Sequence, residues 1–123
     1  MLQLLRRSGV LLATMLALTL ASCGEQDKSR LSDAELHLNP QQAAGRRVYR
    51  AYCSGCHEAY LSRKLDGPSL KGLYGKRYLP SGQPANDERI RHVIVQGRLT
   101  MPGFADVLSA EEVNALIAYL HTL

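Results

Sequence analysis

A hydrophobic face recurs at helical spacing after Asn39, where Pro40 and Gln42 mark a helix start. Asn39 can cap the helix with its side chain, proline suits the first helical position, and a glutamine three residues after the cap can reach back to it. The pattern predicts a helix that runs from residue 40 into Cys53, with one apolar and one basic side. The apolar side holds Ala44, Val48, Ala51 and Tyr52, and the basic side holds Arg46, Arg47 and Arg50.

Two further stretches, residues 87–96 and 110–120, have the same helical pattern. Asn86 or Asp87 can cap the first of these, and Gly97 ends it. Ser109 and Glu112 form a capping box for the second. The residues expected to face inward are Ile90, Val93 and Ile94 in the first stretch and Val113, Leu116, Ile117 and Leu120 in the second.

Loops rich in proline, glycine and serine separate these helices, apart from a short structured piece expected at residues 70–74. No run of alternating apolar and polar residues predicts a strand, so the fold class is all-α, with three main helices and long loops. About 85 residues with one Phe and no Trp make a poor hydrophobic core. We therefore expect a bound group to complete the core.

The first 22 residues have the pattern of an export signal. Arg6 and Arg7 precede an apolar run at residues 10–20, which is shorter than the roughly 20 residues that a membrane span needs. The run ends in Leu-Ala-Ser-Cys, which resembles the lipobox of bacterial lipoproteins; that resemblance implies a lipoprotein signal peptide at residues 1–22 and lipidation of Cys23. The alternative is an ordinary signal peptide in which Cys23 is incidental.

Residues 23–38 are polar, contain no aromatic residue and show no strong apolar period. We expect a flexible tether from lipidated Cys23, with a root-mean-square reach on the order of 20 Å and a limit of about 50 Å. Ser32 and Glu35 can cap one helical turn within it, and His37 is expected to be solvated. The folded domain is then residues 39–123.

The charge of the whole chain indicates little about its function, but one stretch of the chain is strongly basic. The chain of 123 residues has 15 Lys and Arg against 11 Asp and Glu, a formal charge of +4 that falls to +2 when Arg6 and Arg7 leave with the signal. An exported protein with so small a charge is not expected to bind nucleic acid. Residues 46–98 hold 11 basic and four acidic residues. Such a stretch can attract an acidic partner, although a scatter of solvated charges explains it equally well.

The motif that indicates a function is CSGCH at residues 53–57. It has the sequence that attaches c-type haem. Each thiol adds to one haem vinyl group, and the histidine that follows is placed to ligate the iron. A thioredoxin-type redox pair needs a strand–helix context, and a zinc site needs a second pair of ligands; the sequence provides neither. We therefore predict one covalent haem c, attached by Cys53 and Cys56 and ligated by His57.

Met101 is the expected second axial ligand, because it is the only methionine left once the signal is removed. It lies in a loop between the second and third predicted helices. The alternatives are His92, which lies off the apolar helix face, His121, near the chain end, and His37, in the tether. A core methionine without a ligand role is a further alternative.

Residues 40–123 resemble the class I c-type cytochromes. The matching segments, in that family's order, are CSGCH at 53–57, GPSL at 67–70, TMP at 100–102 and LIAYL at 116–120. The resemblance implies the cytochrome c fold, wrapped around one covalently attached haem. It also implies that the backbone carbonyl of Pro68 accepts a hydrogen bond from the His57 ring and so orients this ligand.

The same resemblance implies a close crossing of the first and last helices at Gly45, because glycine permits close approach, with Tyr49 and Tyr119 beside it. The chain departs from the family in having no tryptophan to bind the haem propionates. The candidates for that role are Tyr74, Tyr78 and Arg77, although a core role for either tyrosine is as good an interpretation.

Histidine and methionine together leave the iron no open position, so the site is expected to pass electrons rather than to bind oxygen. We expect a lipid-anchored, monomeric electron carrier, not an enzyme, that faces the periplasm and shuttles electrons between periplasmic or membrane redox proteins. Two alternatives are a haem sensor in which Met101 dissociates and an electron-entry subunit of a dehydrogenase or reductase. Gly24, rather than aspartate, after Cys23 favours the outer over the inner membrane.

Overall fold

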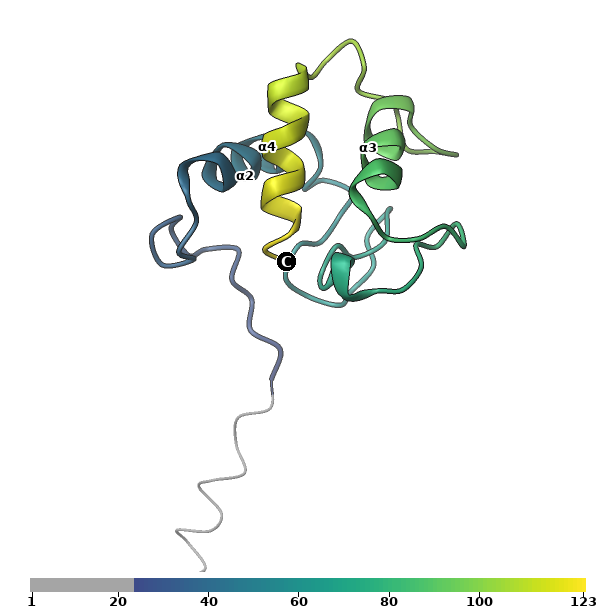
Figure 1. Cartoon of the computed structure of the whole chain (residues 1–123). Helices are drawn as coiled ribbons and strands as arrows, with labels where there is room; N and C mark the ends of the chain where they lie inside the picture. Colours follow the sequence, from purple (N-terminus) through teal and green to yellow (C-terminus); the bar gives the residue numbers. More distant parts are fainter. Residues whose placement is uncertain (1–23) are drawn as a thin grey trace, which may run out of the picture.

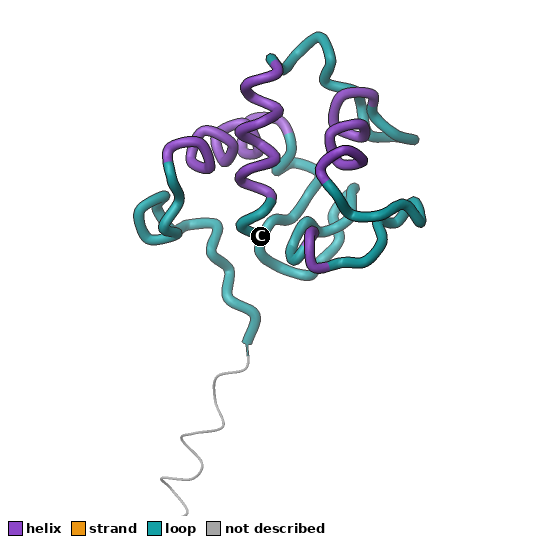
Figure 2. Tube along the Cα trace, viewed as in Figure 1, coloured by secondary structure: helices purple, strands orange, loops and turns teal. Residues whose placement is uncertain are grey.

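The computed structural model describes residues 24–123, and both the predicted export signal and the predicted lipidation site, Cys23, lie outside the described residues. Within this part the elements are α2 (Pro40–Tyr52), the 3-10 helix η1 (Leu73–Gly75), α3 (Asp87–Gln96) and α4 (Ala110–Leu120). Loops make up more of these residues than helices do, and no strand forms among them (Figure 2). The predicted all-α class, with three main helices, is confirmed. None of the helices in residues 24–123 is both long and apolar enough to cross a lipid bilayer.

The predicted helix starts are present in the structure. Asn39 Oδ1 accepts a hydrogen bond from the backbone N–H of Gln42, whose side chain accepts one from the N–H of Asn39. Ser109 and Glu112 make the same reciprocal pair at α4. Asn86, rather than the aspartate after it, caps α3. These contacts satisfy backbone N–H groups that have no partner inside the helix.

The short piece predicted at residues 70–74 is displaced towards the C-terminus. The N–H of Leu70 donates to the carbonyl of Glu58, which holds it in a loop. Gly72 adopts φ +61 and starts the turn of η1, which spans Leu73–Gly75. The predicted boundaries were wrong because a partner distant in sequence, rather than local propensity, decides where this turn begins.

Helices α2 and α4 cross closely, as Figure 1 shows, and this crossing forms the centre of the fold. A Cβ atom at Gly45 would overlap the backbone carbonyl of Ala115, so only glycine allows the approach. The rings of Tyr49 and Tyr119 lie beside it, with centroids 5.5 Å apart. The buried side chains around the crossing are Val48, Tyr49, Val113, Leu116, Ile117, Tyr119 and Leu120.

Arg46 differs from the prediction, which placed it with Arg47 and Arg50 on a solvated side of the first helix. Its side chain is only 2% exposed, whereas the other two are exposed. The cause is the segment before the helix, which folds back over this part of α2. The backbone carbonyls of Ser29 and Leu31 accept hydrogen bonds from the Arg46 guanidinium. Residues 29–38, expected to be part of a flexible tether, therefore contact the domain in this structure.

Candidate haem site

The CSGCH motif forms a tight turn directly after α2. The N–H of Cys53 donates to the carbonyl of Tyr49, and the N–H groups of Cys56 and His57 both donate to the carbonyl of Cys53. Both cysteines are free thiols, with Cys53 half-buried and Cys56 exposed. Burial, together with the neighbouring Cys56, raises the pKa of Cys53 to about 11, so its thiol is protonated at neutral pH.

The imidazole of His57 is held by a second loop. Its Nδ1 atom lies 2.8 Å from the carbonyl oxygen of Pro68. A Cβ atom at Gly67 would overlap the His57 ring, so the backbone of this loop lies directly against the imidazole. The N–H of Gly67 also donates to the carbonyl of Cys56, which joins the loop to the motif. The three motif residues and Pro68 are thus brought together at one place.

Tyr49 adds a contact to this site that the sequence did not indicate. Its hydroxyl donates a 2.7 Å hydrogen bond to the backbone carbonyl of His57. Burial, with the charge of Glu58 nearby, raises the pKa of Tyr49 to about 12, which keeps the hydroxyl protonated as a donor. The sequence assigned this tyrosine only to the helix crossing, and no spacing rule links it to the histidine eight residues later.

Met101 lies on a separate loop between α3 and α4 and is half-buried. Its N–H and carbonyl pair with the carbonyl and N–H of Arg98, each at 2.9 Å, which closes a tight turn. Leu99 in that turn adopts φ +54 and is 93% exposed. Gly97, at φ +76, ends α3 where a Cβ atom would overlap the Met101 carbonyl. The backbone around the methionine is therefore closely constrained.

The three histidines considered as alternatives lie at the surface. His92 and His37 are exposed, as predicted. His121 Nε2 lies 2.8 Å from Asp87 Oδ1, and its ring stacks on Tyr74 with centroids 3.6 Å apart. This histidine thus joins the end of α4 to the start of α3.

Of the residues considered for the haem propionates, Tyr74 is the one with a buried polar group. Within residues 24–123 its hydroxyl meets no partner at hydrogen-bonding geometry. Burial and the nearby Asp87 carboxylate raise its pKa, so it is a neutral donor. Tyr78 is 57% exposed and Arg77 is exposed. Propionate binding by any of them stays a prediction.

The residues present fit a covalently bound haem. Cys53 and Cys56 are unpaired thiols within one turn, as addition to two vinyl groups requires. The contact of His57 Nδ1 with Pro68 engages one ring nitrogen and leaves Nε2 as a ligand atom. Gly67 provides space for the flat imidazole. Together these residues would attach a haem covalently and provide one axial ligand to its iron.

Comparison with known proteins agrees with this site. Residues 40–120 match the family model described as cytochrome C oxidase, cbb3-type, subunit III. Cytochrome c2 iso-1 of Magnetospirillum fulvum is 27% identical over 89 residues, which cover 58% of this chain and 90% of the relative. Cytochrome c-551 of Bacillus subtilis is 28% identical over 88 residues, covering 71% of this chain and 70% of the relative. Cytochrome c6 of Cladophora glomerata is 29% identical over 89 residues, covering 72% of this chain and 90% of the relative.

The family match spans α2, α3 and α4 together with the CSGCH turn. It confirms the predicted cytochrome c fold and the predicted covalent haem c, and with the relatives it confirms an electron carrier rather than an enzyme. The chain belongs to the c-type cytochrome family, as a class I member that carries one covalent haem and transfers electrons.

Proposed function

We propose that this protein carries electrons through a haem iron ligated by His57 and Met101, and that a lipid on Cys23 holds it at a membrane. The 2.8 Å distance from His57 Nδ1 to the Pro68 carbonyl carries the proposal for the first ligand. A carbonyl oxygen can only accept, so Nδ1 bears the proton and Nε2 is free to bind iron. The same hydrogen bond orients the ring and makes it a better ligand.

Met101 is proposed as the second ligand because it is the only methionine in residues 23–123. The pairing with Arg98 and the close packing at Gly97 fix its backbone, and a preorganised ligand loses little entropy on binding. When bound, the haem iron supplies the one-electron redox change, and a thioether ligand favours a higher potential than a second imidazole. The chain's residues attach, orient and shield this group.

Carbon monoxide separates a closed electron-transfer site from a sensor with a labile methionine. The reduced holoprotein would be recorded at neutral pH with and without carbon monoxide. An unchanged spectrum is expected, because iron with two protein axial ligands has no open position. Rapid carbon monoxide binding would instead support a haem sensor in which Met101 dissociates.

The proposed membrane anchor and periplasmic location rest on the sequence of residues 1–23. The Leu-Ala-Ser-Cys segment after a short apolar run supports export and lipidation of Cys23. We propose that the protein is a monomer at the membrane surface and faces the periplasm. Gly24 after Cys23 favours the outer membrane.

A fixed subunit is the second candidate, because the matching family is described as a subunit of a cbb3-type oxidase. Native gel electrophoresis of mildly solubilised membranes distinguishes a mobile electron carrier from a fixed subunit. A carrier is expected to migrate alone, whereas stoichiometric co-migration with a larger oxidoreductase would identify an electron-entry subunit.

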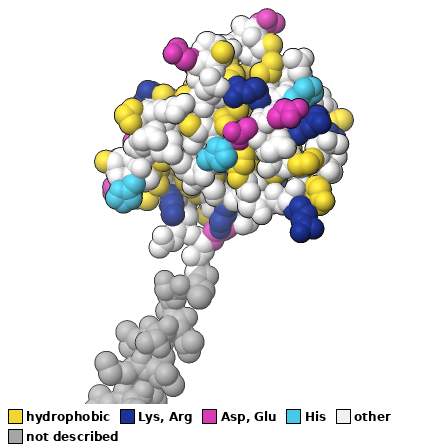
Figure 3. Space-filling model, viewed as in Figure 1, with side chains coloured by type: hydrophobic (Ala, Val, Ile, Leu, Met, Phe, Trp, Pro, Cys, Tyr) yellow, Lys and Arg dark blue, Asp and Glu magenta, His cyan; other side chains and the backbone are white. Residues whose placement is uncertain are grey.

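The proposed docking of an acidic partner depends on how the basic residues of residues 46–98 are distributed. On the face drawn in Figure 3, Lys and Arg side chains lie apart from one another, with acidic and histidine side chains between them. This face is therefore not proposed as a basic docking patch. Mixed charge of this kind gives weaker electrostatic steering than a gathered patch.

A further inference from the structure

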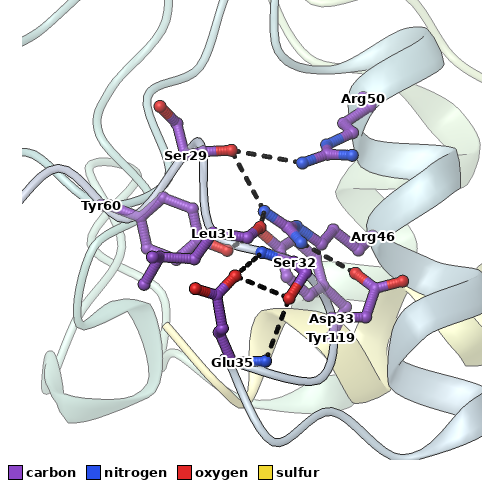
Figure 4. A network of polar contacts seen from close by, with 9 residues as sticks. All are labelled: Ser29, Leu31, Ser32, Asp33, Glu35, Arg46, Arg50, Tyr60 and Tyr119. Carbon is purple, nitrogen blue, oxygen red and sulfur yellow. Dashed lines mark hydrogen bonds and ion pairs between the residues drawn. The ribbon is translucent and has the colours of Figure 1, made fainter.

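The buried guanidinium of Arg46 is not used by the haem site. Its Nη1 lies 2.8 Å from Asp33 Oδ1, and its Nη2 donates to the carbonyl of Leu31 at 2.7 Å (Figure 4). A second bond from Nη2 reaches the Ser29 carbonyl at 3.1 Å. Burial opposes the charge most strongly, but the hydrogen bond and charge of Asp33, together with the nearby Tyr60 and Tyr119, outweigh it, so the pKa of Arg46 is raised. A charge this buried is tolerated only when paired in this way.

The segment that Arg46 binds has a fixed local structure of its own. Ser32 and Glu35 form the predicted cap, with Ser32 Oγ 2.6 Å from a Glu35 oxygen and the Glu35 N–H returning to Ser32. The N–H of Leu36 donates to the Ser32 carbonyl, which closes one helical turn. Leu38 packs against the hydrophobic core. These contacts make a compact element of residues 29–38, named the strap from here on.

A second contact lies closer to the predicted lipid anchor and is of a different kind. Glu25 forms an ion pair with Lys71 and hydrogen bonds to Ser62. Both side chains of the pair are solvent-accessible. Exposed ion pairs contribute little to stability, so this contact can open and close while the Arg46 contacts persist.

We infer that Arg46 locks the strap onto α2 and thereby shortens the membrane tether from residues 23–38 to residues 23–28. This inference rests on the proposed lipidation of Cys23. The fully extended limit of the tether falls from about 50 Å to about 20 Å, and the root-mean-square reach of a flexible chain falls from about 20 Å to about 13 Å. The cytochrome domain is then held beside the membrane.

The locked strap also restricts orientation and therefore the kind of partner. In Figure 1 the described chain leaves the domain on the α2 side, whereas the loop between α3 and α4 (residues 97–109, which include Met101) runs from the α3 side to the top of the view. A short tether at that exit keeps the Met101 loop directed away from the lipid surface. The matching partner is a redox protein that presents its docking surface just above the same membrane, within the reach of residues 23–28.

Hydrogen–deuterium exchange of the holoprotein tests the lock directly. The amides of Leu36 and Leu38 are expected to exchange on the order of 10- to 100-fold faster in Arg46→Gln than in the wild type, since charge-assisted hydrogen bonds are lost. Arg47→Gln is the matched control, because it removes the same charge from an exposed position on α2, and it should exchange as the wild type does.

Asp33→Ala keeps the test decisive if Arg46→Gln fails to incorporate haem. It removes the charged partner of Arg46 from a side chain that is 41% exposed, and strap exchange is expected to rise on the order of 10-fold. Strap amides that exchange at the rate of an unstructured chain in the wild type would overturn the inference. So would equal strap protection in the wild type and in every folded variant.

Neutron reflectometry of the holoprotein on a supported bilayer tests the short tether. A protein layer adjoining the bilayer is expected for the wild type and Arg47→Gln, and a layer whose outer edge reaches up to about 30 Å further out for Arg46→Gln or Asp33→Ala. Equal layers for all variants would overturn the inference about reach. Failure of the wild type to bind the bilayer would contradict the proposed lipid anchor instead, while exchange still reports on the strap.

Discussion

The hydroxyl of Tyr49 donates a hydrogen bond to the backbone carbonyl of His57, so the central helix crossing is joined directly to the haem-binding turn. Tyr49 is buried on α2 and packs against Tyr119 of α4. Through this contact the packing of two helices helps to position the backbone of His57. Pro68 fixes the ring of the same histidine from the other side.

Tyr49→Phe is expected to lower the free energy of unfolding by about 1–2 kcal/mol, because it leaves the His57 carbonyl without its partner while the ring packing is kept. Guanidinium unfolding of the holoprotein, followed by haem absorbance, measures this. Tyr52→Phe is the matched control: Tyr52 is 48% exposed, and its hydroxyl makes no hydrogen bond within residues 24–123. Equal stability of the two variants would contradict a structural role for the Tyr49 bond.

Gly45→Ala is expected to destabilise the protein by about 1–3 kcal/mol, because the added methyl group overlaps the Ala115 carbonyl at the helix crossing. Gly75→Ala is the control, since no atom lies within 4 Å of a Cβ there. Its effect should stay within about 0.5 kcal/mol. Thermal unfolding of both holoproteins gives the comparison, and a wild-type stability for Gly45→Ala would argue against the close crossing.

The helices and their caps were predictable because their determinants are local. Asn39 with Gln42 and Ser109 with Glu112 act within one turn, and apolar spacing identifies the buried face of α3 and α4. The face predicted for α2 was wrong in part: Val48 is buried, but Ala51 and Tyr52 are exposed. The CSGCH motif is equally local, since attachment of haem needs its cysteines and histidine at fixed spacing.

The features that were missed depend on segments distant in sequence. Arg46 has the pattern of a solvated helix residue, and only the strap that folds over it makes it buried. The strap itself is polar apart from a few leucines, of which Leu38 reaches the core. The N–H of Leu70 donates to the carbonyl of Glu58, so Leu70 lies outside the turn predicted for it. In each case a tertiary hydrogen bond overrides the local pattern.

Met101→Ala is expected to lower the reduction potential by on the order of 100 mV, a fraction of the roughly 0.8 V range that axial ligands control. It should also abolish the weak near-infrared sulfur-to-iron band of the oxidised protein. Leu99→Ala, an exposed position in the same turn, is the control and should leave both unchanged. Retention of the band in Met101→Ala would refute ligation by this methionine.

The Glu25 contact is expected to depend on pH. Hydrogen bonds from Lys71 and Ser62 lower the pKa of Glu25 from 4.5 to about 2. A depressed pKa means that the contact contributes fully above pH 4.5 and is lost as the pH falls through about 2. Carboxyl-carbon NMR of the reduced holoprotein should give a Glu25 midpoint below 4.5. Lys71→Gln should shift the midpoint back towards 4.5, and a wild-type midpoint near 4.5 would show that the contact is not formed in solution.

Cys23→Ser is expected to release the protein from membranes, because serine offers no thiol for the lipid that the sequence predicts there. The CSGCH motif, with Cys53 and Cys56, does not include Cys23, so haem attachment should be unaffected and the haem spectrum of the soluble fraction quantifies release. High-salt washing of wild-type membranes is the control: a lipid anchor resists salt, whereas binding through basic residues does not. If the variant stays in salt-washed membranes, the anchor lies elsewhere in the chain or in a bound partner.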